Sequence, residues 1–151
     1  MDRATAELWM RAALAEARDA GAEGEVPVGA VVLVNDKIVG RAHNHSVRLR
    51  DPTAHAEVLA LRRAAHGLGN YRLPGSVVVV TIEPCAMCVG AMIHARVEQL
   101  VYGAADPKAG AVDSHLGLAA APHLNHTIDV VSGVLARECG DLLRAFFESR
   151  R

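Results

Sequence analysis

The chain has 151 residues, of which 51% are hydrophobic, and its formal net charge is −1 at pH 7. This length and apolar content predict a single domain spanning residues 1–151. The sequence contains no apolar stretch long enough for a transmembrane helix and no secretory signal, so we expect a cytoplasmic protein without a membrane partner. The nearly neutral charge excludes a protein that coats nucleic acid through bulk electrostatics.

Basic residues and cysteines are unevenly distributed. Arginine accounts for 14 of the 16 basic residues, and arginine binds phosphates and stacked bases better than lysine does. A local RNA-binding patch and ordinary surface arginines therefore both stay open. Two of the three cysteines form a Cys-x-x-Cys pair, and an odd number of cysteines does not make a disulfide framework. Metal binding or redox chemistry fits this pair better.

Helical and strand patterns alternate along the chain. Apolar residues recur at helical spacing in some segments and cluster in β-branched runs in others, with turn and capping residues between them. The expected helices span residues 5–20, a segment beginning near His55 after a polar loop, 85–94 and 135–146. The expected strands are 28–34 and 37–42, which form a hairpin, then 76–82, 97–103 and 127–131.

This order of elements predicts an α/β fold with a mixed five-stranded sheet and helices on both faces, in three layers (α/β/α). Segment 76–82 contains four consecutive valines, which is typical of a strand buried on both faces. A helix that follows such a strand begins at the carboxyl edge of the sheet, where the sites of α/β proteins usually lie.

Two motifs carry side chains that can bind a metal. Segment His55–Glu57 opens one predicted helix, and segment Pro84–Cys88 opens another, directly after the four-valine strand. His55, Cys85 and Cys88 offer one imidazole and two thiolates, which leaves a fourth tetrahedral position for water, as in a catalytic zinc site. Helix N-termini also favour the thiolate form of cysteine, which is the form that binds metal.

Each motif alone is a weak or moderate signal. A lone Cys-x-x-Cys can be a metal site, a redox pair or incidental, and a lone His-x-Glu carries little information. Glu57 lies about 200° around a regular helix from His55, so the two side chains do not share a face. The metal is therefore expected at the mouth of the helix. There Glu57 can reach a bound water without ligating the metal, and can act as general base and then general acid.

Joined in this order, the motifs resemble those of zinc-dependent nucleobase deaminases. Within that superfamily the chain resembles the bacterial tRNA-specific adenosine deaminases over nearly its whole length. The matching segments are 9–11, 25–31, 51–57, 70–73, 81–94, 125–126 and 146–147. The resemblance implies a cytidine-deaminase-like fold, a homodimer, and hydrolytic deamination of adenosine to inosine at the wobble position of the anticodon of an arginine tRNA.

The resemblance also implies roles for individual residues. His55, Cys85 and Cys88 would hold one Zn²⁺ per subunit, and Glu57 would shuttle protons for a zinc-activated water. Asn44 would hydrogen-bond the flipped nucleotide. The residues expected to shape the base pocket are Val28, Ala30, Ala56 and Pro84.

Contacts with the tRNA anticodon stem-loop are expected from charged and aromatic side chains. The candidates are Arg48, Arg50, Asp106, Lys108, Arg144, Phe147, Arg150 and Arg151. Phe146 lies on the apolar face of the last predicted helix, which favours a position in the core.

Two other interpretations stay open. A deaminase of a free base or nucleoside, of the guanine or cytosine type, would share the zinc and Glu57 and differ in how its pocket closes. A non-catalytic, zinc-stabilised RNA-binding module would share the metal ligands and have no need of Glu57. Cys139 lies at helical spacing from Leu135 and Leu142, which predicts a buried, inert thiol and not a fourth ligand.

Overall fold

The computed structural model describes residues 1–150, so Arg151 lies outside the described part of the chain. Helices, strands and one 3₁₀ turn (η1) follow one another along it. In order they are α1 (Arg3–Ala22), β1 (Gly29–Val34), β2 (Lys37–His43), α2 (Ser46–Leu49), α3 (Ala56–Leu68), β3 (Val77–Ile82), α4 (Ala86–Ala95), β4 (Gln99–Ala104), η1 (Leu118–Ala120), β5 (Asp129–Val131) and α5 (Ala136–Glu148).

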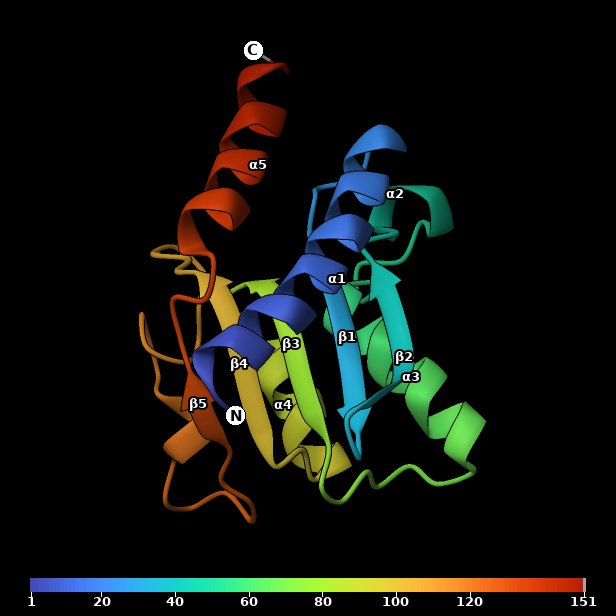
Figure 1. The fold of residues 1–151 in the computed structure, drawn as a ribbon, viewed down its shortest axis with the longest axis vertical. Coiled ribbons are helices and arrows are strands. Elements are labelled where there is room, and N and C mark those ends of the chain that lie inside the picture. Colours follow the sequence, from blue (N-terminus) through green and yellow to red (C-terminus); the bar gives the residue numbers. More distant parts are fainter. Residues whose placement is uncertain (151) are drawn as a thin grey trace.

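The strands form one mixed sheet in the order β2-β1-β3-β4-β5. Strand β1 is antiparallel to both β2 and β3, whereas β3, β4 and β5 are parallel to one another. The carboxyl ends of the three parallel strands therefore meet at one edge, at the top of Figure 1. The predicted five-stranded mixed sheet is confirmed.

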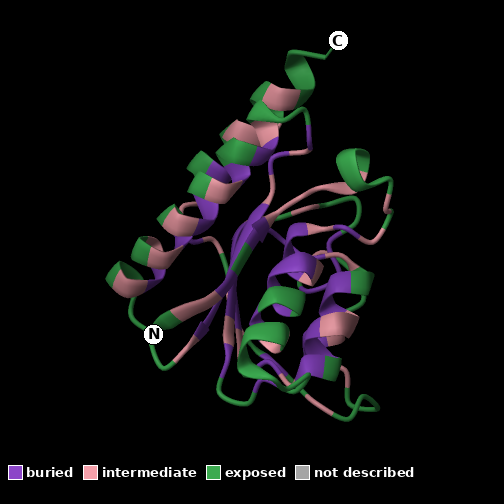
Figure 2. Cartoon of the chain, turned by 90° about the vertical axis from the view of Figure 1, so that its right-hand side faces the viewer, coloured by how far each residue is buried: buried purple, intermediate pink, exposed green. Residues whose placement is uncertain are grey.

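Helices cover both faces of the sheet. Helices α1 and α5 lie on one face and α3 and α4 on the other (Figure 2). Strand β3 is buried on both sides, because Val78 and Val80 contact the cluster under α3 and α4 while Val79 contacts the cluster under α1 and α5. This alternation explains why the four-valine run is apolar at every position.

Small residues let helix α1 approach the sheet closely. A Cβ atom at Gly29 would overlap the backbone of α1 at Ala13 and Ala17. Both alanines are fully buried. The Ala-rich face of α1 therefore packs directly on the start of β1, which holds the first residues of that strand at the upper edge of the sheet.

The structure differs from the sequence-based expectation in two short elements. Helix α2 lies in the segment that was expected to be a polar loop, and the turn η1 lies where no element was predicted. Helix α2 begins where the buried carboxylate of Glu25 accepts hydrogen bonds from the backbone N–H groups of Val47 (3.0 Å) and Arg48 (2.8 Å). A partner more than twenty residues away is invisible to a local pattern. Within residues 1–150, no helix is long and apolar enough to cross a membrane.

Candidate active site

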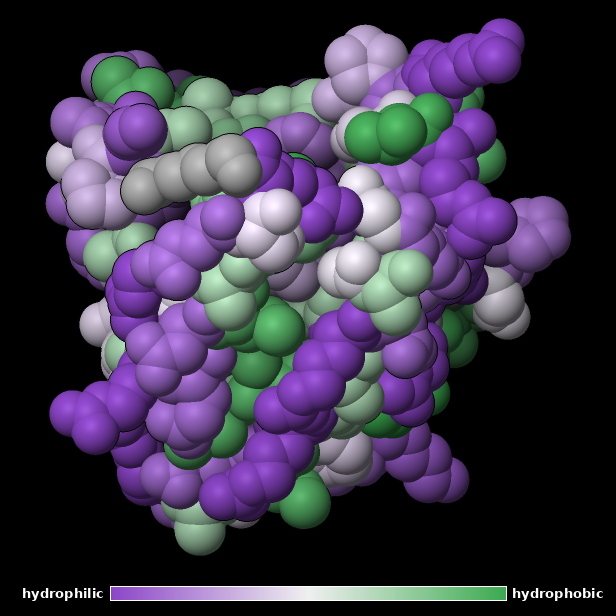
Figure 3. Space-filling model, turned by 90° about the horizontal axis from the view of Figure 1, so that it is seen from above, coloured by the Kyte–Doolittle hydropathy of each residue, from purple (hydrophilic) through white to green (hydrophobic). Residues whose placement is uncertain are grey.

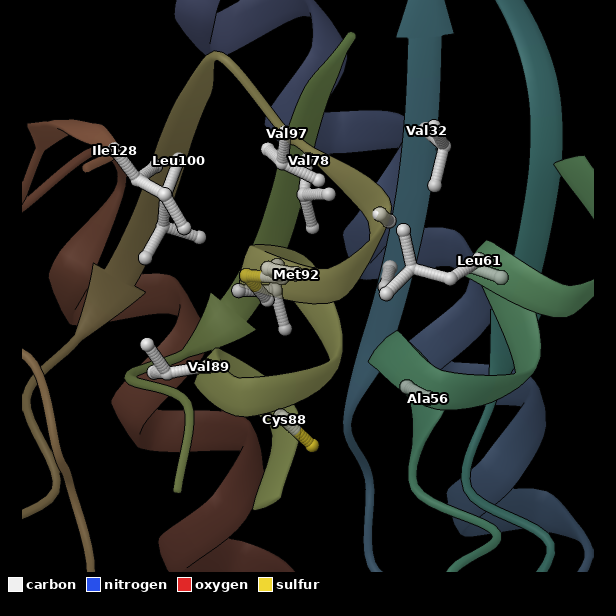
Figure 4. Close-up of a cluster of buried hydrophobic side chains, with 14 of the residues drawn as sticks. Val32, Ala56, Leu61, Val78, Cys88, Val89, Met92, Val97, Leu100 and Ile128 are labelled. Atoms are coloured by element: carbon white, nitrogen blue, oxygen red, sulfur yellow. The ribbon is translucent and has the colours of Figure 1, made fainter. Parts of the chain in front are cut away.

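His55, Cys85 and Cys88 lie together at the upper edge of the sheet. His55 is the N-cap residue of α3 and Cys85 is the N-cap residue of α4, so both precede their helices instead of lying inside them. The Nδ1 atom of His55 is 3.6 Å from Sγ of Cys85 and 3.5 Å from Sγ of Cys88. The sulfur of Cys88 points across toward the first turn of α3, where Ala56 lies (Figure 4).

The donor set fits a zinc ion. All three donor atoms lie within 4.8 Å of one another, and both cysteines are free thiols. Ordinary Zn–S and Zn–N bond lengths in a tetrahedral site place sulfur and nitrogen about 3.5 Å apart, which agrees with both distances found here. The two helix openings therefore present one nitrogen and two sulfurs at the spacing of a zinc site.

The ligand cluster is already polarised. Hydrogen bonds from Cys88 and His55 lower the pKa of the Cys85 thiol to about 3. The hydrogen bond to Cys85 raises the pKa of His55, and the same sulfur together with burial raises the pKa of Cys88. The lowered pKa favours the thiolate form of Cys85, and a thiolate is the form of cysteine that binds metal.

Glu57 lies beside this cluster and is almost completely buried. Only 4% of its surface is exposed, and burial raises the pKa of its carboxyl group. It lines the same cavity of about 240 Å³ as His55 and Cys85. A carboxyl group in this position beside a metal site can accept a proton and return it.

The cavity has an apolar wall and a polar wall. It is lined by Val26, Val28, Asn44, His55, Glu57, Ile82, Glu83, Cys85, Asp106 and Ala109. Of the residues expected at the base pocket, Val28 lines it directly. Ala30 and Ala56 are fully buried in the core beneath it. Pro84 is buried, and its carbonyl accepts a hydrogen bond from the N–H of Ala111 (2.8 Å).

Asn44 caps helix α3 and also lines the cavity. Its Oδ1 accepts a hydrogen bond from the N–H of Ala56 at 2.8 Å, and its own N–H donates to the carbonyl of Val28 at 3.2 Å. The N-cap residue His55 makes no side-chain capping bond of its own. Because the imidazole of His55 turns toward the two sulfurs, the cap comes from Asn44, which lies twelve residues before Ala56 in the chain.

Glu83 is a functional candidate that the sequence motifs did not single out. Its buried carboxylate accepts hydrogen bonds from the backbone N–H groups of Asp106 (3.0 Å), Val112 (3.1 Å), Asp113 (2.9 Å) and Ser114 (2.9 Å). Burial alone would raise its pKa, but the hydroxyl of Ser114, which also donates to this carboxylate, and the backbone N–H groups outweigh burial and lower the pKa to about 2. The only local signal was a carboxylate directly after an apolar strand.

Through Glu83 the loop 106–114 is held over the cavity. Asp106 lines the cavity, whereas Lys108 is exposed and donates its backbone N–H to the Asp106 carboxylate (3.1 Å). Of the two predicted substrate contacts in this loop, Asp106 therefore faces the cavity and Lys108 faces solvent above it.

The remaining predicted RNA contacts within residues 1–150 lie on the surface, and Arg151 lies outside the described residues. Phe147 is 48% exposed, and the guanidinium of Arg150 stacks over the ring of Phe146 at 3.7 Å. The expectation that Phe146 belongs to the core is wrong, because it is only partly buried. The guanidinium of Arg150, just beyond the end of α5, covers one face of its ring.

Helix α2, with Arg48, and the C-terminal end of α5 lie at the same upper end of the molecule (Figure 1). Hydrophilic side chains dominate this surface when it is viewed from above (Figure 3). Arg48 is 3.4 Å from Glu23, Arg144 pairs with Asp141, and Arg50 is exposed. Arg150 and Arg50 are thus the more available charges for a polyanion.

Comparison with known proteins places this site in context. Residues 3–104 match the family described as the zinc-binding region of cytidine and deoxycytidylate deaminases. The chain is 46% identical over 145 residues to the tRNA-specific adenosine deaminase of Bacillus subtilis, covering 96% of this chain and 90% of that protein. It is 50% identical over 147 residues to the enzyme of the same name from Haemophilus influenzae, covering 96% and 84%.

Solved structures agree with the predicted cytidine-deaminase-like fold. One comes from work on A-to-I editing by tRNA:A34 deaminases at the wobble position of transfer RNA. It has a TM-score of 0.87 at 44% identity and covers 89% of this chain and 98% of that chain. The guanine deaminase of Nitrosomonas europaea has a TM-score of 0.79 at 29% identity, with 93% and 83% covered. The predicted α/β/α architecture is confirmed.

Proposed function

Because the chain belongs to the cytidine and deoxycytidylate deaminase family, we propose that it hydrolyses adenosine to inosine at the wobble position of a tRNA anticodon, that of an arginine tRNA. The observation that carries the proposal is the buried carboxylate of Glu57 in one cavity with His55 and Cys85. The curated relatives and the tRNA:A34 deaminase structure support adenosine in tRNA as the substrate.

One zinc ion per subunit would be held by Nδ1 of His55 and the Sγ atoms of Cys85 and Cys88. When bound there, zinc acts as a Lewis acid that brings the pKa of a water molecule into the neutral range. The ligand atoms lie at the required spacing because Asn44 caps the opening of α3 and the opening of α4 directly follows strand β3.

Glu57 is proposed to move the protons. The reaction replaces the exocyclic amine of adenine by oxygen: water adds to the amine-bearing carbon, the C–N bond breaks and ammonia leaves. The Glu57 carboxylate takes one proton from the attacking water and delivers it to the purine ring nitrogen. It then takes the proton of the new hydroxyl group and delivers it to the departing amine, so that ammonia leaves and a carbonyl group remains. Burial keeps this carboxyl group away from bulk water, so the proton stays within the site.

Base recognition falls to the other side chains of the cavity. Oδ1 of Asn44 is used by the helix cap, so its amide NH₂ is the group that can donate to the base. Val28 supplies an apolar wall. The outer contacts with the flipped nucleotide and its neighbours are assigned to Asp106, Lys108, Phe147 and Arg150. Flipping is inexpensive in an anticodon loop, where bases unstack readily.

The test is incubation of the zinc-loaded protein with an arginine tRNA anticodon stem-loop, followed by sequencing for inosine. We expect inosine at the wobble position alone, and its absence from a fully zinc-loaded reaction contradicts the proposal.

We also propose that the chain folds as one domain, pairs as a homodimer and works in the cytoplasm, where tRNA is modified. Sedimentation and cell fractionation test the last two points.

A second candidate is deamination of a free base. It is favoured by the fold shared with the guanine deaminase of Nitrosomonas europaea. That function predicts release of ammonia from free guanine or cytidine while the stem-loop stays unchanged. The 29% identity to that enzyme, against 46% to the Bacillus subtilis tRNA deaminase, makes it the weaker candidate.

A further inference from the structure

A second group of metal-binding side chains lies outside the catalytic cavity. Glu23 follows the end of α1, His43 ends β2, and His45 comes two residues later. Oε2 of Glu23 is 3.1 Å from Nε2 of His43 and 3.2 Å from Nε2 of His45. One carboxylate oxygen and two imidazole nitrogens therefore face a common point, and the three donor atoms lie within 4.8 Å of one another.

A second carboxylate orients His43 toward that point. Nδ1 of His43 is 2.8 Å from Oε1 of Glu16, while Oε2 of Glu16 accepts a hydrogen bond from Arg41 at 2.9 Å. An imidazole that donates Nδ1–H to a carboxylate presents its Nε2 lone pair to whatever faces it. Most metal-binding histidines donate their second ring N–H to a carboxylate, a carbonyl or a water in this way, which fixes the tautomer and raises the basicity of the ligand nitrogen.

The surroundings of these side chains favour a cation. The side chains of Glu16 and His43 are 14% and 12% exposed. Those of His45 and Glu23 are 20% and 30% exposed, so the group is buried on one side and open to water on the other. Three acidic side chains lie near the two rings, those of Glu16, Asp19 and Glu23. Two basic side chains, Arg41 and Arg48, pair with Glu16 and Glu23. With neutral imidazoles the local charge is negative, which attracts a cation.

We propose that Glu23, His43 and His45 form a second metal site, which binds a divalent first-row transition ion and leaves its remaining positions to water. Two imidazoles and one carboxylate suit Zn²⁺, Ni²⁺, Co²⁺ or Fe²⁺, whereas Mg²⁺ and Ca²⁺ prefer sites made of oxygen alone. The catalytic cluster differs in kind, because it presents two sulfurs and no carboxylate.

The second site would act on the catalytic cavity through Asn44. His43 and His45 flank Asn44, and the contacts of the three side chains show that they lie on opposite sides of the chain. Both imidazoles face Glu23 while the Asn44 carboxamide faces the cavity and caps α3. An ion that joins the two histidines fixes the segment on both sides of Asn44 and ties it to the end of α1.

Zinc stoichiometry tests the proposal directly. Wild-type protein and variants are equilibrated with buffered free Zn²⁺, and bound zinc is counted by elemental analysis. We expect His45→Ala and Glu23→Gln to bind one ion fewer per chain than the wild type. The control His66→Ala, which removes an exposed histidine of α3, should match the wild type. Glu16→Gln should keep the site and weaken its affinity by about 10- to 100-fold.

Equal zinc counts in the wild type, His45→Ala and Glu23→Gln would overturn the proposal and leave a simple ion pair between Glu23 and protonated histidines. Because every variant keeps His55, Cys85 and Cys88, an error in the catalytic assignment changes all counts alike and leaves the difference intact. Co²⁺ provides a second readout. Thiolate ligands give an intense charge-transfer band, so the ion lost in His45→Ala should be one without that band.

Discussion

Oδ1 of Asn44 accepts the N–H of Ala56 at 2.8 Å, so a residue just beyond β2 caps the helix that carries Glu57. The cap and the substrate contact proposed for Asn44 use different atoms of one carboxamide. Oδ1 accepts the hydrogen bond that caps the helix, and the amide NH₂ group remains free to donate a hydrogen bond to the base. Stability and activity at this position can therefore be separated by substitution.

We expect Asn44→Ala to lose about 1 kcal/mol of unfolding free energy, as for other lost N-caps, together with most of the activity. Asn44→Asp keeps an acceptor for the Ala56 N–H and lacks the NH₂ donor. It should retain near wild-type stability and still lose activity. Urea unfolding and stem-loop deamination measure the two effects, and full activity in Asn44→Asp would exclude the amide donor from base recognition.

Glu57→Gln should abolish turnover and leave the zinc content unchanged. The substitution keeps the size of a buried side chain and removes its ability to carry a proton. Proton transfer by a positioned side chain contributes about 10²- to 10⁴-fold, so kcat should fall by at least that range. Single-turnover deamination and elemental analysis provide the measurement. A rate within tenfold of the wild type would assign the proton transfers to another group.

Cys85→Ala and Cys88→Ala should each lose the tightly bound zinc and lower the thermal stability, because metal binding couples to folding. The matched control is Cys139→Ala, which removes a buried sulfur on α5 far from the ligands along the chain. It should keep zinc while losing some stability through the small cavity that it leaves. Stoichiometric zinc in both Cys85→Ala and Cys88→Ala after dialysis against metal-free buffer contradicts the ligand assignment.

The reactivity of the thiols should also distinguish the two zinc ligands, Cys85 and Cys88, from the buried Cys139. Burial raises the pKa of Cys139 to about 12, and the side chain is 1% exposed. We expect a thiol reagent to find no reactive cysteine in the zinc-loaded protein, Cys85 and then Cys88 after chelation, and Cys139 only after unfolding. Rapid labelling of Cys139 in the folded protein, detected by mass spectrometry, would show that α5 opens readily.

Glu83→Gln should loosen loop 106–114. The amide NH₂ would face backbone donors that now point at a carboxylate, so we expect a loss of about 3 kcal/mol and a rise in KM through Asp106. In the wild type the pKa of Glu83 is about 2, below the usual 4.5. A carboxyl group with a lowered pKa stabilises the fold above its unfolded pKa and loses that contribution as pH falls toward the folded pKa.

The stability difference between the wild type and Glu83→Gln should therefore be constant above about pH 5 and shrink between about pH 4.5 and pH 2. Denaturant unfolding of both proteins across this range measures it. Loss of zinc in acid affects both proteins alike and cancels in the difference. A difference that stays constant down to pH 2 would mean that the carboxylate charge does not hold the loop.

Local sequence determined most of the elements and the members of the proposed zinc cluster. The valine run of β3 showed a strand buried on both faces, and the helical patterns placed the starts of α3 and α4 at or near His55 and Cys85. These features depend on neighbours within a few residues, so the spacing of apolar residues is sufficient to find them. The cluster could be predicted because each ligand lies at a helix opening, and openings after strands meet at one edge.

Contacts between distant segments were decided only by the tertiary structure. Four such contacts join residues twelve or more positions apart. They are the Glu25 hydrogen bonds at the start of α2, the Asn44 cap of α3, the Glu83 hydrogen bonds to loop 106–114, and the group of Glu23 with His43 and His45. Each is a polar side chain that satisfies backbone or imidazole groups brought near it by packing. A short motif does not encode such a partner, because the same glutamate in another fold would face water.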